Sequence, residues 1–143
     1  MTANHETPVL PEWPARTIAV LATVDDGEPY AIPVSAPVRA GDRRILLNLH
    51  STRGSLGRLR KQPAVALLVL SAGDVAFTAR GRARVVEESM AVSPSYVAVA
   101  IEVEHVDDHR QPAFVVEGGV DRRWVDEAER EALGERVRAL MSL

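Results

Sequence analysis

Residues 45–70 of the chain, ILLNLHSTRGSLGRLRKQPAVALLVL, place two apolar runs on either side of a short basic segment. Ile45–Leu49 and Ala64–Leu70 have the length and the branched apolar composition of buried strands. Pro63 stands directly before the second run, and a helix normally ends at or before the residue that precedes a proline. The stretch therefore predicts a strand, a loop, a short helix over residues 52–62 and a second strand.

The segment between these strands carries the parts of an anion site. Hydroxyls, a glycine and cations gather where the helix should begin: Ser51, Thr52, Arg53, Gly54, Ser55 and Arg58. The first amides of a helix have no partner within the helix, so they can bind an anion. Two interpretations stay open, because Ser51 or Thr52 could instead cap the helix while the arginines face solvent. His50 is expected to donate a hydrogen bond to a ligand rather than to act as a general acid.

The composition restricts the class of protein. A chain of 143 residues is the size of one domain with one core. The net charge is −3, so no overall field attracts nucleic acid or an anionic membrane. The sequence holds no cysteine, which excludes disulfides and metal sites built on sulfur. It has neither a signal-peptide pattern nor an apolar run of membrane-spanning length, so we expect a cytoplasmic location.

Strand signals continue on the N-terminal side of the opening stretch. Thr17–Val24 is β-rich, and the Asp-Asp-Gly sequence of residues 25–27 is typical of a hairpin turn. Tyr30–Val38 follows as the next strand. Pro33 and Pro37 each remove a backbone donor from it, which predicts an edge strand, a bulge or a place where a ligand takes the neighbouring strand's position.

Strands and a final helix follow on the C-terminal side. Val75–Glu87 alternates apolar and polar residues, and Gly81 in its middle predicts a bend. Tyr96–Val106 alternates in the same way, and residues 113–116 are a candidate for one more short strand. Residues 121–143 have helical periodicity.

These elements predict a single compact unit. Six short strands with tight turns favour a small antiparallel barrel over a layered α/β fold. Residues 1–15 contain three prolines and are expected to be an extended arm with one helical turn near Trp13. Residues 16–120 are expected to form the barrel domain. Residues 121–143 are expected to form a helix capped by Asp121 and packed on the same domain.

No side chain can be assigned as catalytic. The chain has no GxSxG, HExxH, GxGxxG or Walker pattern. His105 and His109 flank two aspartates, but the strand pattern before them makes a solvent loop more plausible than a metal site, so no metal is predicted. Arg80, Arg82 and Arg84 alternate along one strand, which favours a solvated or subunit-contacting surface over nucleic-acid binding.

Three stretches carry a resemblance to a known family: IAVLATVDDGEPYAIPVS, ILLNLHSTRGSLGRLRKQPAVALLVL and VAFTARGRARVVE. Together they resemble the pyridoxamine 5'-phosphate oxidase-like, FMN-binding split-barrel superfamily, well over residues 16–87 and loosely as far as Val106. The resemblance implies a mainly β fold, a six-stranded antiparallel split β-barrel with short helices and a C-terminal helix. It also implies a homodimer with two flavin sites at the subunit interface.

The resemblance also implies which residues bind the flavin. The ring would lie along Pro33, Val34 and Ser35. The phosphate would lie near His50, Ser51, Thr52, Arg53, Ser55 and Arg58. True pyridoxamine phosphate oxidases have an arginine at the position of Ile32 and a lysine at the position of Ser55, so the vitamin-specific reaction is not expected. The phosphate's countercharge is left to Arg53 or Arg58.

The function implied by the resemblance is an oxidoreductase that binds FMN noncovalently and transfers hydride to or from an unknown small molecule. One alternative cofactor is the deazaflavin coenzyme, whose longer acidic tail would favour Arg58, Arg60 and Lys61. Another alternative is a non-catalytic split-barrel protein that binds no flavin tightly. The expected partners are a second copy of the chain and a small-molecule substrate, with no nucleic acid and no membrane.

Overall fold

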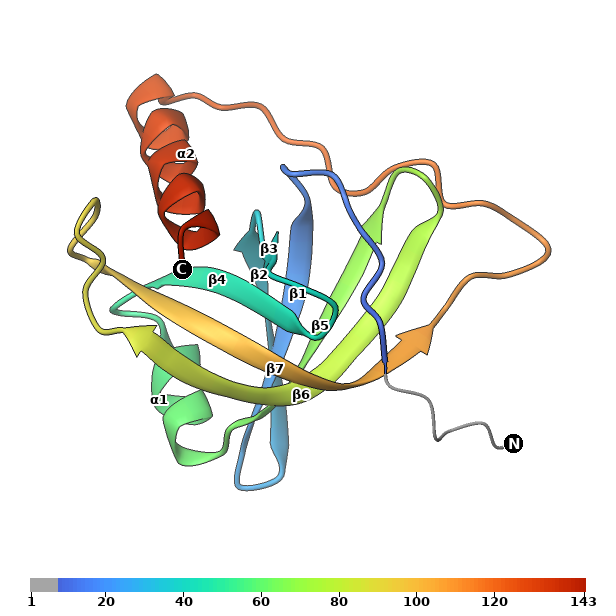
Figure 1. Cartoon of the computed structure of the whole chain (residues 1–143), viewed down its shortest axis with the longest axis horizontal. Helices are drawn as coiled ribbons and strands as arrows, with labels where there is room; N and C mark the ends of the chain where they lie inside the picture. The colour runs from blue at the N-terminus through green and yellow to red at the C-terminus, as the bar shows by residue number, and fades with distance from the viewer. Residues whose placement is uncertain (1–7) are drawn as a thin grey trace.

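A computed structural model describes residues 8–143 of the chain, and a curled antiparallel sheet of seven strands forms its centre (Figure 1). The elements are β1 (Ile18–Asp25), β2 (Glu28–Ser35), β3 (Val38–Arg39), β4 (Arg44–His50), α1 (Gly54–Lys61), β5 (Ala64–Ser71), β6 (Val75–Glu87), β7 (Tyr96–Asp108) and α2 (Glu127–Met141). The strand order across the sheet is β2-β1-β5-β6-β7-β4-β3. The fold is therefore mainly β, an antiparallel split barrel, as predicted.

The strand count differs from the predicted six because the run Tyr30–Val38 is broken in two. Ala36 has a φ of 53°, a left-handed conformation that a continuous strand does not contain. The chain turns there, so β2 pairs with β1 while the two residues of β3 pair with β4. The run that looked like one strand thus supplies both edges of the sheet.

Pro33 lies in β2 where the sheet tolerates a proline, and Pro37 lies between β2 and β3. Ala36 donates its amide to the Thr17 carbonyl at 2.8 Å. Because hydrogen-bonded and non-hydrogen-bonded pairs alternate in an antiparallel ladder, the backbone groups of Val34 also face β1, while those of Pro33 and Ser35 point away from it. Pro33 therefore removes no ladder bond, which agrees with the prediction of an edge strand.

The longest ladder of the sheet, between β6 and β7, is irregular. Both strands are 13 residues long, and their register shifts between Arg80 and Gly81. Gly81 lies so close to the Glu102 carbonyl that any Cβ would overlap it. The predicted bend at Gly81 is thus a β-bulge, and it depends on the absence of a side chain.

The core has two parts, one on each face of β4 and β7. The larger part fills the inside of the curled sheet and includes Ile45, Leu67 and Phe77. The smaller part lies on the outer face, where Leu46 of β4 packs with Leu140 of α2. Coverage on both faces explains why the β4 sequence is almost continuously apolar.

The described part of the N-terminal arm, residues 8–14, is in neither helix nor strand, and it crosses in front of the sheet (Figure 1). Leu10 is buried and donates its amide to the Asp42 carbonyl at 2.7 Å. Trp13 donates its indole N–H to the Pro37 carbonyl at 2.9 Å. These contacts take the place of the helical turn predicted near Trp13, while residues 1–7 of the predicted arm lie outside the described residues.

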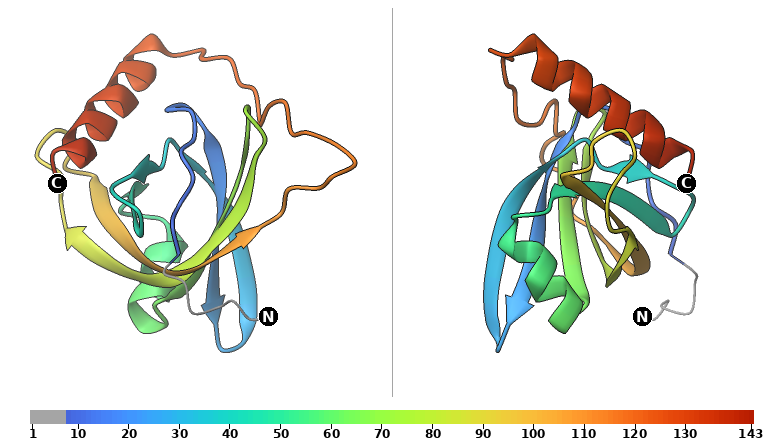
Figure 2. Two further views of the ribbon diagram at one scale, coloured as in Figure 1. Left: turned by 45° about the vertical axis from the view of Figure 1, so that its right-hand side comes forward. Right: turned by 90° about the vertical axis from the view of Figure 1, so that its left-hand side faces the viewer.

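The C-terminal helix begins later than predicted. Its cap is Asp126, whose carboxylate accepts hydrogen bonds from the amides of Ala128 at 2.9 Å and Glu129 at 3.4 Å, so Asp121 is not the cap. Residues 109–126 form an irregular connection to α2 along the rim of the barrel (Figure 2). The strand predicted at residues 113–116 is absent, and only a single bridge joins Gln111 to Phe114.

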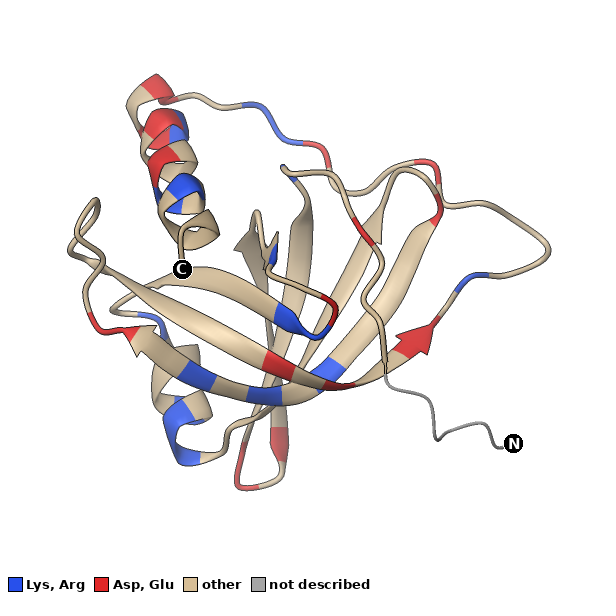
Figure 3. Cartoon of the chain, viewed as in Figure 1, with Lys and Arg blue, Asp and Glu red and all other residues tan. Residues whose placement is uncertain are grey.

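Charged side chains cover the outer surface unevenly. Lys and Arg follow β6 and α1, whereas Asp and Glu gather on the first half of α2 (Figure 3). On β6, Arg80 lies 2.7 Å from Asp107 and Arg84 lies 3.4 Å from Glu102, so these arginines pair with β7 within the chain. Neither helix in the described part of the chain has the length and apolar character needed to span a bilayer.

We expect Gly81→Ala to lower the free energy of unfolding by about 1–3 kcal/mol, because the new methyl group must push β6 away from the Glu102 carbonyl. Urea denaturation measures this change. Gly57→Ala on α1 is the matched control, since a Cβ there meets open space and should stabilise the helix by about 0.5–1 kcal/mol. Equal effects of the two substitutions would contradict the role given to the bulge.

Candidate functional site

A cavity of about 280 Å³ lies where β2, the end of β4, the start of β7 and α2 meet. Five of the predicted flavin-binding residues line it: Pro33, Val34, Ser35, His50 and Arg53. They come from two stretches that are separated by β3 and most of β4. The curl of the sheet thus brings the predicted ring side and part of the predicted phosphate side into one cavity.

His50 has a defined orientation at the end of β4. Its Nδ1 lies 3.2 Å from the Thr52 amide and 2.8 Å from the Thr52 hydroxyl. Because the amide can only donate, Nδ1 accepts, and a neutral ring carries its proton on Nε2. The ring also packs edge-on against Tyr96, with 5.1 Å between centroids. His50 can therefore present an N–H donor to a ligand, and Thr52 acts on the site through this ring.

The remaining predicted residues do not line the cavity. Arg58 donates from Nε to the Thr23 hydroxyl at 2.8 Å, and its guanidinium lies 4.1 Å above the Tyr30 ring. It therefore ties α1 to β1 and β2. Ser55 is 1% exposed, and its hydroxyl has no hydrogen-bond partner among the described residues. Ser51 is exposed outside the cavity.

The α2 side of the cavity holds Arg136, which was not predicted as a site residue. Its side chain is 5% exposed and donates from Nε to the Asn48 side-chain oxygen at 2.8 Å. The guanidinium lies 3.7 Å above the Tyr96 ring. No ion pair among the described residues includes Arg136, so its charge is buried without a carboxylate.

Two more charged residues complete this wall. Arg122, in the connection before α2, donates from Nη1 to the Ser35 hydroxyl at 2.8 Å and lies 4.4 Å from the Trp124 ring centre. Glu129 is the one carboxylate among the residues that line the cavity, against the three arginines at positions 53, 122 and 136. The cavity is therefore locally cationic in an acidic chain, which favours an anionic ligand.

Only some of these additional residues left a signal in the sequence. Asn48 is the single amide inside the otherwise apolar run ILLNL of β4, and a buried amide needs partners. Arg136 falls four residues after Ala132 and four before Leu140, on the face predicted to be apolar. Arg122 and Trp124 lie in an irregular connection, where no periodicity could identify them.

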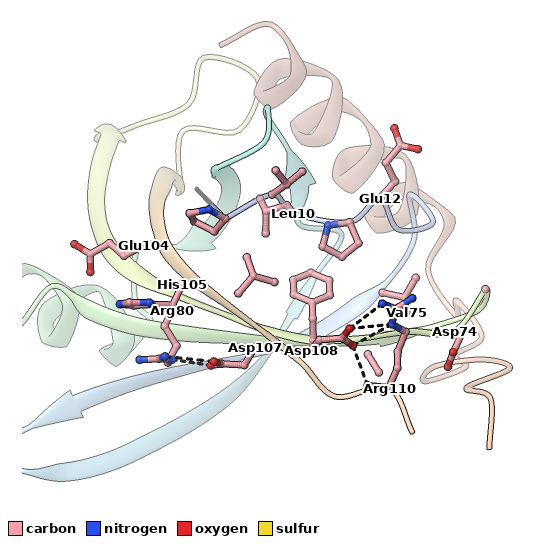
Figure 4. Close-up of a pocket in the computed structure, with 17 residues that line it drawn as sticks. Leu10, Glu12, Asp74, Val75, Arg80, Glu104, His105, Asp107, Asp108 and Arg110 are labelled. Atoms are coloured by element: carbon pink, nitrogen blue, oxygen red, sulfur yellow. Dashed lines mark hydrogen bonds and ion pairs between the residues drawn. The ribbon is translucent and has the colours of Figure 1, made fainter. Parts of the chain in front are cut away.

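A larger hollow of about 900 Å³ lies elsewhere, between the N-terminal arm and the far ends of β6 and β7 (Figure 4). Four of its charged side chains form two ion pairs. Arg80 contacts Asp107 at 2.7 Å and lowers the pKa of that carboxyl, while the Arg110 guanidinium lowers the pKa of Asp108 to about 2. The other carboxylates of this lining, Glu12, Asp74 and Glu104, leave a surplus of negative charge. An acidic hollow does not suit an anionic ligand, so we place the candidate site in the smaller cavity.

The histidines of the HVDDH sequence lie at this far end. His109 makes a 2.7 Å hydrogen bond to the Thr78 hydroxyl. His105 lies at the edge of the larger hollow (Figure 4). Over residues 8–143 the structure contains no group of three or more histidine, cysteine, aspartate or glutamate side chains placed to hold a metal ion.

Solved structures share this fold. The chain is similar to an FAD-binding protein from Mesorhizobium loti, with 19% identity and a TM-score of 0.53 over 64% of this chain and 84% of that one. General Stress Protein 26 from Bacillus anthracis matches with 16% identity and a TM-score of 0.53 over 64% and 82%. HupZ from Group A Streptococcus matches with 15% identity and a TM-score of 0.58 over 72% and 90%. At these identities the likeness shows the fold alone.

The sequence matches no curated protein, but it matches a family profile. The profile is that of pyridoxamine 5'-phosphate oxidase, and the match covers residues 9–117. It includes the whole sheet and α1, whereas the end of the connection and α2 lie beyond it. The profile spans most of the chain and agrees with the observed fold, so the chain belongs to the pyridoxamine 5'-phosphate oxidase-like split-barrel superfamily.

Proposed function

We propose that this protein is a flavin-binding oxidoreductase that uses noncovalently bound FMN to transfer hydride to or from a small molecule. One observation carries the proposal: the β2 segment Pro33–Ser35 and the segment that contains His50 and Arg53 line the same cavity. Membership of the superfamily supports it, as does the shared fold of the FAD-binding protein from Mesorhizobium loti.

The ring side of the cavity fits a flavin chemically. The backbone groups of Pro33 and Ser35 point away from β1, so this edge offers a carbonyl acceptor and an amide donor outside the ladder. An isoalloxazine ring has carbonyl and imide groups along one side, which are the complementary partners. Val34 and Leu133 are buried beside this edge and give the cavity an apolar surface.

Arg53 is the residue that best fits the flavin phosphate. It stands at the N-cap of α1, and its side chain makes no capping hydrogen bond. The charge, the nearby first amides of the helix and the His50 Nε2–H are all suited to a phosphate. Arg58 is less suitable, because Thr23 and Tyr30 already hold its guanidinium.

The bound flavin would supply the redox chemistry. The chain's own residues would bind and orient it: the β2 edge through backbone hydrogen bonds, Arg53 through its charge and the apolar side chains by excluding water. We assign no side chain as a general acid or base. A proton would come from the substrate or from solvent.

The size of the cavity supports a dimeric site. Its volume of about 280 Å³ is just below the range of roughly 300–1,000 Å³ that is usual for ligand pockets. One chain would therefore enclose only part of a flavin. We propose that a second copy of the chain covers the rest, as the homodimer expected from the resemblance would do. A cytoplasmic location stays a prediction from the sequence.

The ion pairs of Arg60 and Lys61 on α1 favour FMN over the deazaflavin coenzyme. Arg60 pairs with Glu88 at 2.8 Å, and Lys61 pairs with Asp25 at 3.2 Å. A longer acidic tail would have to compete with these carboxylates for both residues. A non-catalytic barrel without flavin remains the alternative of a different class, and the next experiment distinguishes it.

Purified protein should be yellow, with the absorbance bands of a flavin, or should retain added FMN after gel filtration removes the free flavin. At a free FMN concentration of 100 times Kd, binding should add about 2.7 kcal/mol to the free energy of unfolding, seen as a higher melting temperature. A colourless protein that neither FMN nor the deazaflavin coenzyme stabilises against heating would exclude both the FMN-dependent and the deazaflavin-dependent oxidoreductase.

Arg53→Gln should weaken FMN binding by about tenfold or more and leave riboflavin binding unchanged, because only FMN carries the phosphate. Arg58→Gln is the matched control. It should lower the free energy of unfolding by about 1 kcal/mol through loss of its Thr23 and Tyr30 contacts, with FMN affinity preserved. Fluorescence titration with both ligands measures the affinities. If only Arg58→Gln lowers the affinity for FMN, then Arg58 binds the phosphate and Arg53 does not.

A further inference from the structure

Arg136 is a buried cation whose environment within the chain is incomplete. Burying a charge is costly unless a countercharge or several hydrogen bonds compensate it. Arg136 is 5% exposed, yet its strongest polar contact is the neutral oxygen of Asn48 at 2.8 Å. A second contact, from Nη1 to the Ser93 hydroxyl, is long at 3.5 Å. No carboxylate among the described residues pairs with it.

Asn48 is incomplete in a complementary way. A guanidinium has donors only, so the Asn48 oxygen must be the atom that faces Arg136. This fixes the orientation of the amide, so its Nδ2 group cannot contact the Arg136 Nε. Nδ2 is buried without a hydrogen-bond partner among the described residues, in a side chain that is 8% exposed. Unpaired buried donors of this kind are uncommon and point to a missing acceptor.

Both residues line the same cavity, so a single ligand group could satisfy both. Asn48 holds the Nε of Arg136, and the Tyr96 ring, 3.7 Å away, holds the plane of the guanidinium. Nη2 is left as a donor in this fixed plane, and Nη1 has only its long contact to Ser93. A fixed guanidinium is suited to the paired oxygens of a carboxylate or phosphate. Glu129 is the carboxylate on this wall, and no ion pair found among the described residues joins it to Arg136.

We infer that Arg136 and the Nδ2 group of Asn48 together bind an oxyanion, a carboxylate or a phosphate, that belongs to the substrate. The assignment to a substrate rests on the proposed function, in which Arg53 takes the flavin phosphate. Arg136 lies on α2, beyond the residues that match the family profile, while Arg53 lies within them. The oxyanion site is thus a feature that α2 adds to the barrel.

The test uses Asn48→Asp, which places a carboxylate beside Arg136 and removes the Nδ2 donor. Flavin-free protein is titrated calorimetrically with inorganic phosphate and with succinate at constant ionic strength. We expect the variant to bind the anion that the wild type binds at least about tenfold more weakly, with a melting temperature no lower than that of wild type, because its new carboxylate compensates Arg136.

Arg138→Gln is the matched control, since it changes the net charge by the same amount on the exposed face of the same helix. It should leave anion affinity unchanged within about twofold, because a distant surface charge is largely screened. The inference is overturned if neither anion binds the wild type, or if Asn48→Asp and Arg138→Gln weaken binding equally.

A further titration with FMN and riboflavin separates the two sources of the oxyanion. If it belongs to the substrate, Asn48→Asp leaves the affinities for both flavins unchanged and weakens succinate or phosphate binding to the FMN-loaded protein at least about tenfold. If Asn48→Asp weakens FMN but not riboflavin, the oxyanion is the cofactor's phosphate and the inference is wrong. Asn48-dependent anion binding in a protein that binds no flavin would reject the proposed function and leave the oxyanion site standing.

Discussion

The close approach of Gly81 to the Glu102 carbonyl is the constraint on which the remaining architecture depends. It lets two 13-residue strands cross at a bulge and curl instead of continuing as a flat ladder. The curl carries β4 and β3, at one edge of the sheet, round toward β2 at the other edge. Without this bend, Pro33–Ser35 and His50 would lie on opposite sides of a wide sheet, and the cavity between them would not form.

The cavity has walls of two different origins. The barrel contributes the β2 edge, His50 and Arg53, and all of these fall within the residues that match the family profile. The connection and α2 contribute Arg122 and Arg136, which lie beyond it. The first wall offers backbone groups and one exposed cation, whereas the second offers a buried cation that a neutral amide and an aromatic ring hold in place.

The sequence was sufficient for most of the fold because its signals are local. Alternation, turn residues and Pro63 identified the strands and α1 to within a few residues. The exceptions have physical causes. The left-handed Ala36 divided one predicted strand, and the Asp126 carboxylate, not Asp121, began α2. The first depends on a backbone angle and the second on which of two aspartates caps the helix. A pattern of apolar residues contains neither piece of information.

The candidate site was predictable only in part, because its contacts are not local. The resemblance pointed to Pro33–Ser35, His50 and Arg53. It could not indicate that Arg58 turns toward Tyr30. Nor could it indicate that Asn48 meets Arg136, 88 positions along the chain. The signs of that pair were two polar residues at positions that should be apolar, Asn48 in β4 and Arg136 in α2. Such a residue is worth following in other sequences, since its partner must be found elsewhere in the fold.

The irregular connection of residues 109–126 has a consequence for how this protein can diversify. It joins α2 to the end of β7 without adding a strand to the sheet, and the large core inside the barrel contains no residue of α2. Substitutions on the cavity-facing side of α2 can therefore change which molecules are admitted while the barrel keeps its folding determinants. The residues of the inner core and the α2 residues that line the cavity therefore lie in separate parts of the chain, on either side of the irregular connection.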